Sequence, residues 1–424
     1  MKHKRLVSCV LSVIMILLCT CVTPVVAVDD TDNSVETHNQ VTIQSNDTVK
    51  DHTVISDDVI SILATTTFNE KSLLSKGLAE IEIIATDIPE FNYWKNADLV
   101  EFRWLHSFET GLITHALFEI IGENGQHGYM IYDCEREESS SFSATASPYA
   151  LVEESLRTRS LTSDKSYYFY APMTYGCGIL NDESLIDIYD IYGLIADKDL
   201  NEDNVLRNVS FQSNEIKKTT SQTRIVVGDT DAVLDYEQRR AELEVSTTNR
   251  SLDYPNYYSI SGVPNYRQSS GCLCIPTSMS NVLSYWDQNG RPDLVPSSQD
   301  SSRETYIKNN IVSYLTTAGG TGKNSSIDPA FESYIENNGD YNYTGIGIWY
   351  PNYDDLKAEI YGFECPCLIG FPSIYGSGHM TTGVGYSCSS GNKVIVHDNH
   401  STVAVYQSWA DVDFMFSCTI RIPW

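Results

Sequence analysis

The sequence predicts an α+β fold built from two parts, a small N-terminal domain and a larger C-terminal domain. In each part, a segment with apolar residues at helical spacing precedes short apolar runs bounded by Gly, Asn or Ser, which are typical of strands. A polar stretch between about residues 200 and 258 separates the two parts. Helices followed by groups of strands, without strict alternation, indicate the α+β class.

The N-terminal domain is expected to begin with a helix. Residues 71–85 show helical apolar spacing, and two strand-like runs at 112–121 and 128–132 flank a Gly-Glu-Asn-Gly turn. Two apolar runs around such a turn predict a hairpin. A further apolar stretch at 166–180 contains four consecutive aromatic residues. Together these elements predict a small α+β domain over residues 67–230.

The C-terminal domain, residues 258–424, is expected to place a helix before its strands. Apolar spacing predicts that helix at 277–287, followed by a loop-rich middle with one more helix near 328–337. Strand-like runs then occur at 367–371, 379–386 and 393–397. The last two runs flank a Ser-Ser-Gly turn, so we expect them to pair as a hairpin.

The N-terminus has the features of a secretory signal peptide over residues 1–27: a basic start, an apolar run and small residues before the cleavage site. The apolar run is short for a membrane-spanning helix, and no second run of that length follows. Residues 28–66 are polar and acidic and are expected to form a disordered spacer. A second polar segment, 231–257, is expected to link the two domains. These features predict a secreted protein with no membrane attachment after signal removal.

The chain is strongly acidic, with a formal net charge of −28 at pH 7. Such a charge repels phosphate backbones and anionic lipid surfaces. The composition therefore argues against nucleic acid or membrane as a partner.

A glutamine and a cysteine six residues apart stand out in the C-terminal domain. Cys274 comes just before the first predicted helix, where the positive end of the helix dipole favours a thiolate over a thiol. The side-chain amide of Gln268 is well placed to donate a hydrogen bond to a developing oxyanion. The pair suggests a cysteine nucleophile with an oxyanion-hole donor.

A cysteine nucleophile needs a base and a group that orients this base. His379 opens one strand of the predicted C-terminal hairpin, and Asp398 directly follows the other strand. If the two strands pair, the carboxylate of Asp398 lies where it can accept a hydrogen bond from the imidazole of His379. Each residue alone also has a plain structural interpretation, but their combination favours a catalytic site.

The neighbouring cysteines leave alternatives open. Cys272 is a second candidate nucleophile, but it lacks the helix start directly behind it. Two C-x-C pairs, Cys272 with Cys274 and Cys365 with Cys367, differ from the two-residue spacing of common zinc sites, so we expect no metal site. A disulfide between Cys272 and either Cys365 or Cys367 is expected instead.

The segment VPNYRQSSGCLCIPTSMSNVLSYW resembles the nucleophile segment of papain-like cysteine peptidases, in the group related to bacteriocin-processing double-glycine peptidases. GHMTTGVGY and VIVHDNH resemble the histidine and aspartate strands of that group. The resemblance covers residues 262–424. It implies a papain-like fold, with a helix carrying the cysteine and an antiparallel sheet carrying the histidine and aspartate, and no cofactor. The implied site residues are Cys274 as nucleophile, His379 as base, Asp398 as orienting residue and Gln268 as oxyanion-hole donor.

Two residues depart from the pattern of this group. Ile275 stands where glycine is usual, next to the nucleophile. Asp398 is followed by Asn399 rather than proline, so Asn399 is an alternative third member of the site. A catalytically inactive relative is therefore a further interpretation.

The N-terminal segment ALFEIIGENGQHGYMIYD resembles a strand-turn-strand in propeptides of exported bacterial papain-like peptidases. This resemblance implies that residues 67–230 are a pro-domain that inhibits the peptidase domain within the same chain. A tethered inhibitor needs only modest affinity, because its effective concentration is high. Maturation is then expected to cut the polar linker.

The resulting functional prediction is a secreted cysteine endopeptidase made as a zymogen, with proteins or peptides as substrates. One alternative is an amidase or transferase with the same residues that acts on cell-wall or isopeptide bonds. Another is a non-catalytic papain-like module that serves in binding or adhesion.

Overall fold

The structure is a computed structural model that describes residues 68–107, 112–161, 165–171, 174–180, 186–189, 194–198, 223–228, 233–234, 238, 241, 254–268, 273–339, 341–371 and 379–421. The predicted signal peptide (1–27) and spacer (28–66) lie outside these residues, as does most of the predicted linker (231–257). Within the described ranges, no helix has both the length and the apolar character needed to cross a membrane.

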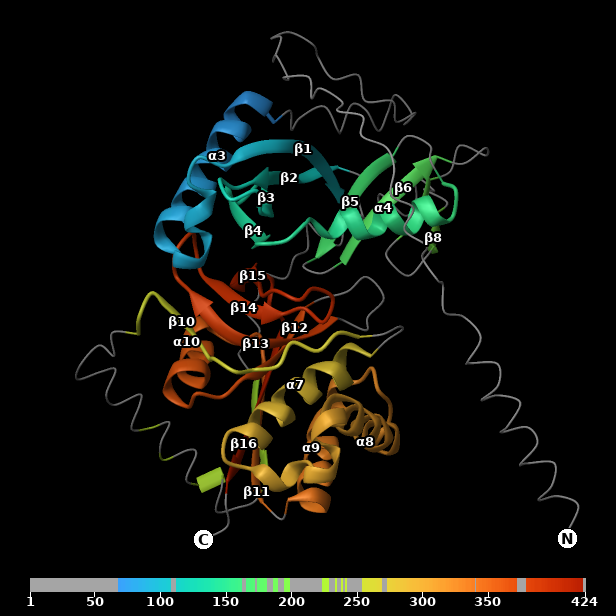
Figure 1. Ribbon diagram of the computed structural model, residues 1–424, viewed down its shortest axis with the longest axis vertical. Helices are drawn as coiled ribbons and strands as arrows, with labels where there is room; N and C mark the ends of the chain where they lie inside the picture. The colour runs from blue at the N-terminus through green and yellow to red at the C-terminus, as the bar shows by residue number, and fades with distance from the viewer. Residues whose placement is uncertain are drawn as a thin grey trace, which may run out of the picture. The chain divides into compact units, whose positions relative to one another are not determined.

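The N-terminal part contains two α-helices and eight strands among the residues described. In chain order its elements are α3 (Glu70–Asp87), η1 (Pro89–Trp94), β1 (Asp98–Ser107), β2 (Ile113–Ile121), β3 (His127–Asp133), β4 (Glu138–Ser143), α4 (Pro148–Thr158), β5 (Lys165–Ala171), β6 (Thr174–Leu180), β7 (Ile186–Tyr189) and β8 (Leu194–Lys198) (Figure 1). β2 pairs antiparallel with β3, which confirms the predicted hairpin. The predicted helix at 71–85 is confirmed as α3, and the stretch 166–180 forms β5 and β6.

Helix α3 is held at its start by a side chain and along its length by the sheet. The Asn69 side chain accepts a hydrogen bond from the Ser72 backbone N–H at 3.1 Å, which caps the helix N-terminus. A Cβ atom at Gly77 would lie only 2.1 Å from the ring of Phe118 on β2. Glycine at this position therefore lets the helix approach the sheet closely.

Neighbouring residues of β2 face opposite sides of the sheet, because side chains alternate along a strand. Leu117 belongs to a buried cluster that includes Tyr149 and Val152 of α4. Phe118 belongs to a different cluster, which includes Ile81 of α3. The N-terminal sheet is thus covered by α3 on one face and α4 on the other.

The remaining elements come after this part of the chain. They are β9 (Thr223–Gly228), β10 (Tyr257–Ser259), α7 (Cys274–Gln288), η2 (Pro292–Leu294), η3 (Ser297–Ser302), α8 (Arg303–Ala318), η4 (Asn324–Ser326), α9 (Ile327–Asn338), β11 (Asn342–Trp349), α10 (Tyr353–Lys357), η5 (Ala358–Gly362), β12 (Cys367–Phe371), β13 (His379–Ser387), β14 (Lys393–His397), β15 (Val405–Ser408), η6 (Trp409–Asp411) and β16 (Phe414–Arg421). The three predicted strands are confirmed as β12, β13 and β14, and the predicted helix near 328–337 is confirmed as α9. β13 and β14 pair antiparallel, so the predicted C-terminal hairpin is also confirmed.

Two expectations about helices in this part need correction. The first helix begins at Cys274 and not at residue 277, since Pro276 falls in the first turn, where proline is tolerated. The middle is not loop-rich, because it contains α8. That helix buries only Ile307, Ile311 and Leu315, a narrow stripe on an otherwise polar segment, which explains why its periodicity was weak.

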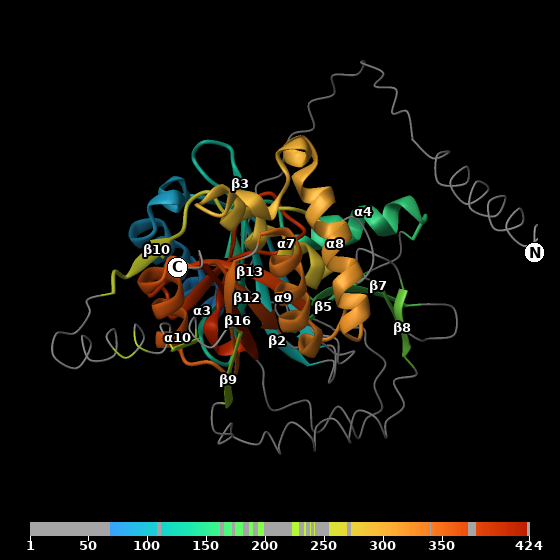
Figure 2. The same cartoon turned by 90° about the horizontal axis from the view of Figure 1, so that it is seen from below.

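The strands form one mostly antiparallel sheet, and the predicted α+β class is confirmed. Hydrogen-bonded neighbours follow the order β8-β7-β6-β5-β1-β2-β3-β4-β15-β14-β13-β12-β16-β11-β9, with β10 paired to β13. The β1–β5 pair is parallel. Helices α7, α8 and α9 lie together on one side of β12, β13 and β16, and α10 lies on the other side (Figure 2). Helix α7 therefore packs directly against β13.

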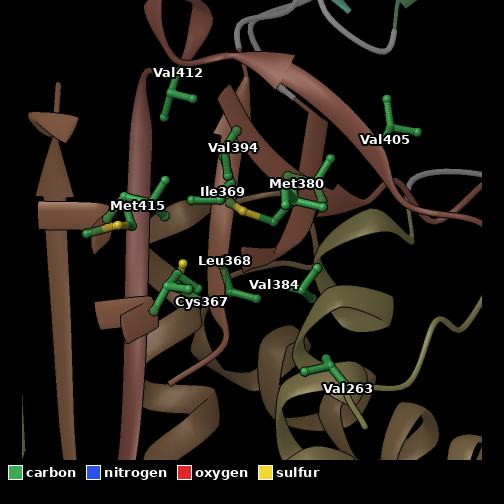
Figure 3. Close-up of a cluster of buried hydrophobic side chains, with 14 of the residues drawn as sticks. Val263, Cys367, Leu368, Ile369, Met380, Val384, Val394, Val405, Val412 and Met415 are labelled. Atoms are coloured by element: carbon green, nitrogen blue, oxygen red, sulfur yellow. The ribbon is translucent and has the colours of Figure 1, made fainter. Parts of the chain in front are cut away.

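The core between the helices and this sheet is aliphatic and sulfur-rich. Figure 3 shows Leu368 and Ile369 of β12 together with Met380 and Val384 of β13 and Met415 of β16. All of these side chains are at most 3% exposed. This packing fixes the position of β13 against α7.

The predicted disulfide from Cys272 to Cys365 or Cys367 is wrong. Cys365 and Cys367 are both free and buried, while Cys272 lies outside the described residues. The Cys365 sulfur lies 3.3 Å from the hydroxyl of Ser417 and 3.2 Å from the carbonyl oxygen of Cys418. Its thiol therefore serves as a small, buried hydrogen-bonding group.

Candidate active site

Cys274 is the first residue of helix α7. Its thiol is free and half-buried. Leu273, at the N-cap position, supplies no side-chain hydrogen bond to the helix N-terminus. The positive end of the helix dipole is therefore left to act on the cysteine sulfur.

His379 is the first residue of β13, the strand on which α7 packs, and this packing brings its imidazole to the thiol. Burial alone raises the pKa of the Cys274 thiol. A hydrogen bond to His379, the charge of His379 and the backbone N–H groups of Met380 and Ile275 together lower it below its ordinary value. Cys274 and His379, which were predicted as separate candidates from the sequence, thus lie together in the structure.

The pKa of the His379 imidazole changes in the opposite direction to that of the Cys274 thiol. Burial lowers the pKa of His379, but the hydrogen bond and charge of Cys274, and then the backbone and charge of Asp398, raise it above its ordinary value. A thiol with a lowered pKa beside an imidazole with a raised pKa favours the thiolate–imidazolium pair. This arrangement is what a cysteine nucleophile requires.

Asp398 reaches His379 through its main chain and not through its carboxylate. The His379 Nε2–H donates to the backbone carbonyl oxygen of Asp398 at 3.0 Å. The carboxylate instead accepts hydrogen bonds from the backbone N–H groups of His400 at 2.9 Å and Ser401 at 2.7 Å. The expected carboxylate–imidazole hydrogen bond is therefore replaced by a carbonyl–imidazole bond, and the carboxylate shapes the turn that presents this carbonyl.

Asn399 is fully buried and has a φ of 65°, a left-handed conformation that asparagine tolerates. Its side-chain Nδ2 donates to the carbonyl oxygen of Met380 at 2.8 Å, to the Ser278 hydroxyl at 2.9 Å and to the carbonyl oxygen of Cys274 at 3.3 Å. Asn399 thus connects the start of α7 to the start of β13. This pattern indicates a clamp between the two elements and not a direct partner of His379.

Gln268 lies beside the same turn. Its backbone N–H donates to the carbonyl oxygen of Asn399 at 2.9 Å. Residues 269–272, which connect it to the cysteine, lie outside the described residues. The structure therefore places the Gln268 backbone next to the Asp398–Asn399 turn, and the oxyanion-hole role of its side chain stays a prediction.

Ile275, the residue that departs from the glycine of the resembled group, has its side chain in the core. It is 2% exposed and belongs to the large buried cluster around the sheet. Its backbone N–H contributes to lowering the pKa of the Cys274 thiol. The isoleucine side chain is therefore accommodated by packing, away from solvent.

His400 was not among the predicted site residues, although it is one of three histidines in the C-terminal domain and lies two residues after Asp398. Its ring stacks on that of His379, with centroids 5.1 Å apart and an interplanar angle of 13°. Burial first, and then the charge of His379, lower the pKa of His400 to about 4. His400 is therefore neutral at physiological pH and supports the His379 ring from one face.

The third histidine, His397, has a different place. Its Nδ1 lies 2.9 Å from the carbonyl oxygen of Pro264, which ties the segment before Gln268 to the end of β14. Burial lowers the pKa of His397 below its ordinary value. His397 therefore helps to hold the segment before Gln268 against β14.

Comparison with known proteins gives one family. Residues 260–416 match the model of the Peptidase_C39 like family. No curated protein and no solved structure matches the chain. The matched segment contains Gln268, Cys274, His379 and Asp398 on the elements described above. The C-terminal part of this chain, residues 260–416, is therefore similar to C39-like peptidases, in agreement with the papain-like cysteine peptidase domain predicted there.

Proposed function

We propose that this protein is a secreted cysteine endopeptidase made as a zymogen, with Cys274 as nucleophile and His379 as general acid and base. The observation that carries the proposal is the contact between the two side chains, in which the pKa of the thiol is lowered and that of the imidazole is raised. Such a pair places the nucleophilic thiolate next to the imidazolium proton that the leaving amine takes up.

In the proposed reaction, the Cys274 thiolate attacks the carbonyl carbon of a peptide bond and forms a tetrahedral oxyanion. The Gln268 side-chain amide donates a hydrogen bond to that oxygen. The oxyanion then collapses, the C–N bond breaks, and the His379 imidazolium gives its proton to the departing amine. The product of this half-reaction is an acyl-enzyme with a neutral imidazole.

Hydrolysis of the acyl-enzyme reverses the proton movement. The neutral His379 takes a proton from water while the water oxygen attacks the thioester carbon. The new tetrahedral intermediate expels the Cys274 thiolate, releases a carboxylic acid and leaves the imidazolium in place. Because Nε2 donates to the Asp398 carbonyl, Nδ1 is the nitrogen that exchanges this proton.

We further propose that the N-terminal region restrains the peptidase domain before maturation. Its strand β4 lies next to the loop after the Asp398 turn, where the Ser143 hydroxyl donates to the Ala404 carbonyl oxygen at 2.8 Å. Tyr129 on β3 is also close enough to Asp398 for the carboxylate charge to contribute to the raised pKa of the phenol, after the main effect of burial. A domain attached at this loop is suitably placed to affect the site. We expect the signal at 1–27 to direct export and the linker at 231–257 to be the site of maturation.

The test compares wild-type protein with Cys274→Ala and with Cys388→Ala, each incubated alone and with casein under reducing conditions. Cys388 is also a free, half-buried thiol, so its removal controls for the loss of a cysteine as such. We expect wild type and C388A to cleave casein and to show, on a denaturing gel, an N-terminal region cut from the peptidase domain, and C274A to do neither.

Other results would contradict this function in distinct ways. If casein stays intact while cell-wall peptides or isopeptide bonds are cut in a manner dependent on Cys274, the amidase or transferase function replaces it. If reduced wild-type protein is inert toward all of these substrates, the non-catalytic binding function replaces it.

A further inference from the structure

The peptidase sheet is bordered on both edges by strands that precede the predicted linker. On one edge, β4 pairs antiparallel with β15, with Ser143 opposite Val405 and Ser141 opposite Gln407. On the other edge, β9 pairs antiparallel with β11 from Gly228 opposite Thr344 to Thr223 opposite Trp349. Both upstream strands complete main-chain hydrogen bonding that an edge strand otherwise leaves open.

At the β4–β15 junction, aromatic side chains from both parts of the chain form one packed group. The rings of Phe142 and Tyr406 stack with centroids 4.7 Å apart, and Phe91 meets each of them edge-on at 5.3 Å. All three residues are completely buried. The Tyr406 hydroxyl donates to Glu90 at 2.7 Å, so its polar end is satisfied by the upstream part as well.

Polar groups at this junction are also paired across the two parts. The Lys393 side chain is completely buried, and its ammonium donates to the Ser139 carbonyl oxygen. The Gln407 amide donates to the Ser141 hydroxyl at 2.8 Å. The guanidinium of Arg136 lies 3.1 Å from the carboxylate of Asp411. Separation of the two parts would remove these partners and expose the aromatic group to water.

At the β9–β11 edge the backbone approach is very close. Gly228 has a φ of 115°, and a Cβ atom there would lie 2.1 Å from the carbonyl oxygen of Tyr343. A side chain at this position would both strain the backbone and collide with β11. The glycine thus fits β9 to this edge.

From these two edges we infer that a cut within the predicted linker, residues 231–257, does not release the upstream part. The upstream fragment stays bound through β4 on β15 and β9 on β11, and the mature protein is a two-chain molecule. Two attachment points on one fragment strengthen each other, because the second contact forms at high effective concentration once the first is made.

This inference depends on the pairing of the strands and not on peptidase activity. Its test can therefore fail or succeed independently of the proposed function. The test uses the full chain with Cys274→Ala, which prevents self-processing, and with the recognition sequence of a site-specific protease in place of residues 245–251. The protein is cut to completion, diluted to about 1 µM and passed through a size-exclusion column in native buffer. Denaturing gel electrophoresis of the same fractions shows that cleavage is complete.

We expect both fragments to elute together at the volume of the uncut chain, and to separate only in denaturant. Elution of the two fragments at separate volumes in native buffer overturns the inference.

Two variants test where the fragment is held. Arg136→Ala removes the Arg136–Asp411 contact, whereas Lys76→Ala removes an exposed ion pair with Glu137 that lies wholly within the upstream part. Both variants are first checked for an unchanged unfolding transition before cleavage. We expect R136A to speed dissociation of the cut fragments by about fivefold or more, and K76A to leave it unchanged, because truncation of a partly buried interfacial charge acts mainly on the dissociation rate. Equal dissociation rates for the two variants would show that the β4–β15 junction does not hold the fragment.

Discussion

Asp398 contributes two different groups to the site. Its carbonyl oxygen orients His379, and its carboxylate holds the backbone N–H groups of His400 and Ser401. The carboxylate acts on the imidazole only through its charge, which is among the weaker causes of the raised pKa of His379. Because the two groups have different roles, we expect activity to tolerate Asp398→Asn and to be lost to a greater extent in Asp398→Ala.

We predict that Asp398→Asn keeps activity within about tenfold of wild type, because an amide oxygen can still accept the two turn hydrogen bonds. Asp398→Ala loses the turn and should lower kcat/KM much further.

In D398N the lost negative charge lowers the pKa of the imidazolium. The alkaline limb of the kcat/KM profile, where the imidazolium loses its proton, should therefore move to lower pH. An orienting carboxylate in direct contact with the base is worth about 10⁴-fold when replaced by its amide. A loss of that size in D398N would contradict the carbonyl assignment.

Cys274 and His379 could be selected as candidates from the sequence, because a cysteine before a predicted helix and a histidine at the start of a predicted strand are recognisable by residue type and position. The structure places these two side chains against each other. The carbonyl of Asp398 could not be predicted, since every residue has a carbonyl and its direction depends on the turn. His400 was missed for a similar reason. Stacking depends on ring orientation, which is set by the turn after β14 and not by a sequence spacing.

At the scale of elements, the site is the meeting point of the start of α7, the start of β13 and the turn after β14. Asn399 joins all three, because its side chain lies in the turn and its amide donates to groups on both other elements. Buried amides with several partners contribute to both stability and precise geometry.

We predict that Asn399→Ala lowers the free energy of unfolding by roughly 1–3 kcal/mol, since it leaves buried carbonyls without a donor. It should also reduce kcat more than it raises KM, because the loosened clamp misplaces Cys274 relative to His379. The matched control is Asn289→Ala. The Asn289 amide donates to the carbonyl of Tyr285 at the far end of α7. N289A should leave kcat unchanged, and an equal loss of kcat in both variants would contradict the clamp.

Local sequence patterns predicted the hairpin of β13 and β14 and the strand β12 with nearly correct bounds. These strands are continuous apolar runs with a clear turn between the last two, so the signal is local. Helix α8 was not predicted, because its few buried residues lie among polar ones. Its stability comes from packing on α7 and α9, which no local window contains.

At the scale of the whole molecule, the sequence predicted two parts, and the described residues from 68 onward belong to one compact unit. The pairing of β4 with β15 joins residues more than 260 positions apart in the chain. Neither strand carries a local sign of this partner. The same holds for β9, which lies in a polar stretch and pairs with the far edge of the sheet. Long-range strand pairing is therefore the part of this fold that composition and periodicity did not reveal.

This architecture places the candidate site on the scaffold that the upstream strands help to complete. The strands β14 and β15, which bracket the Asp398 turn, are directly paired, and β15 is paired in turn with β4. The geometry around His379 thus depends on contacts from both parts of the chain.

If Cys274 and His379 form an activated thiolate–imidazolium pair, the rate at which iodoacetamide alkylates Cys274 should show this in its dependence on pH. Wild type and His379→Ala are compared, with each modified cysteine identified by peptide mass. We predict that Cys274 reacts with an apparent pKa below the value of about 8.5 for a free thiol, and that H379A moves it upward. Burial raises the pKa of Cys365, Cys367 and Cys418, so these thiols should stay unreactive over the same range. An ordinary apparent pKa for Cys274 that is the same with and without His379 would show that the two residues do not form an activated pair.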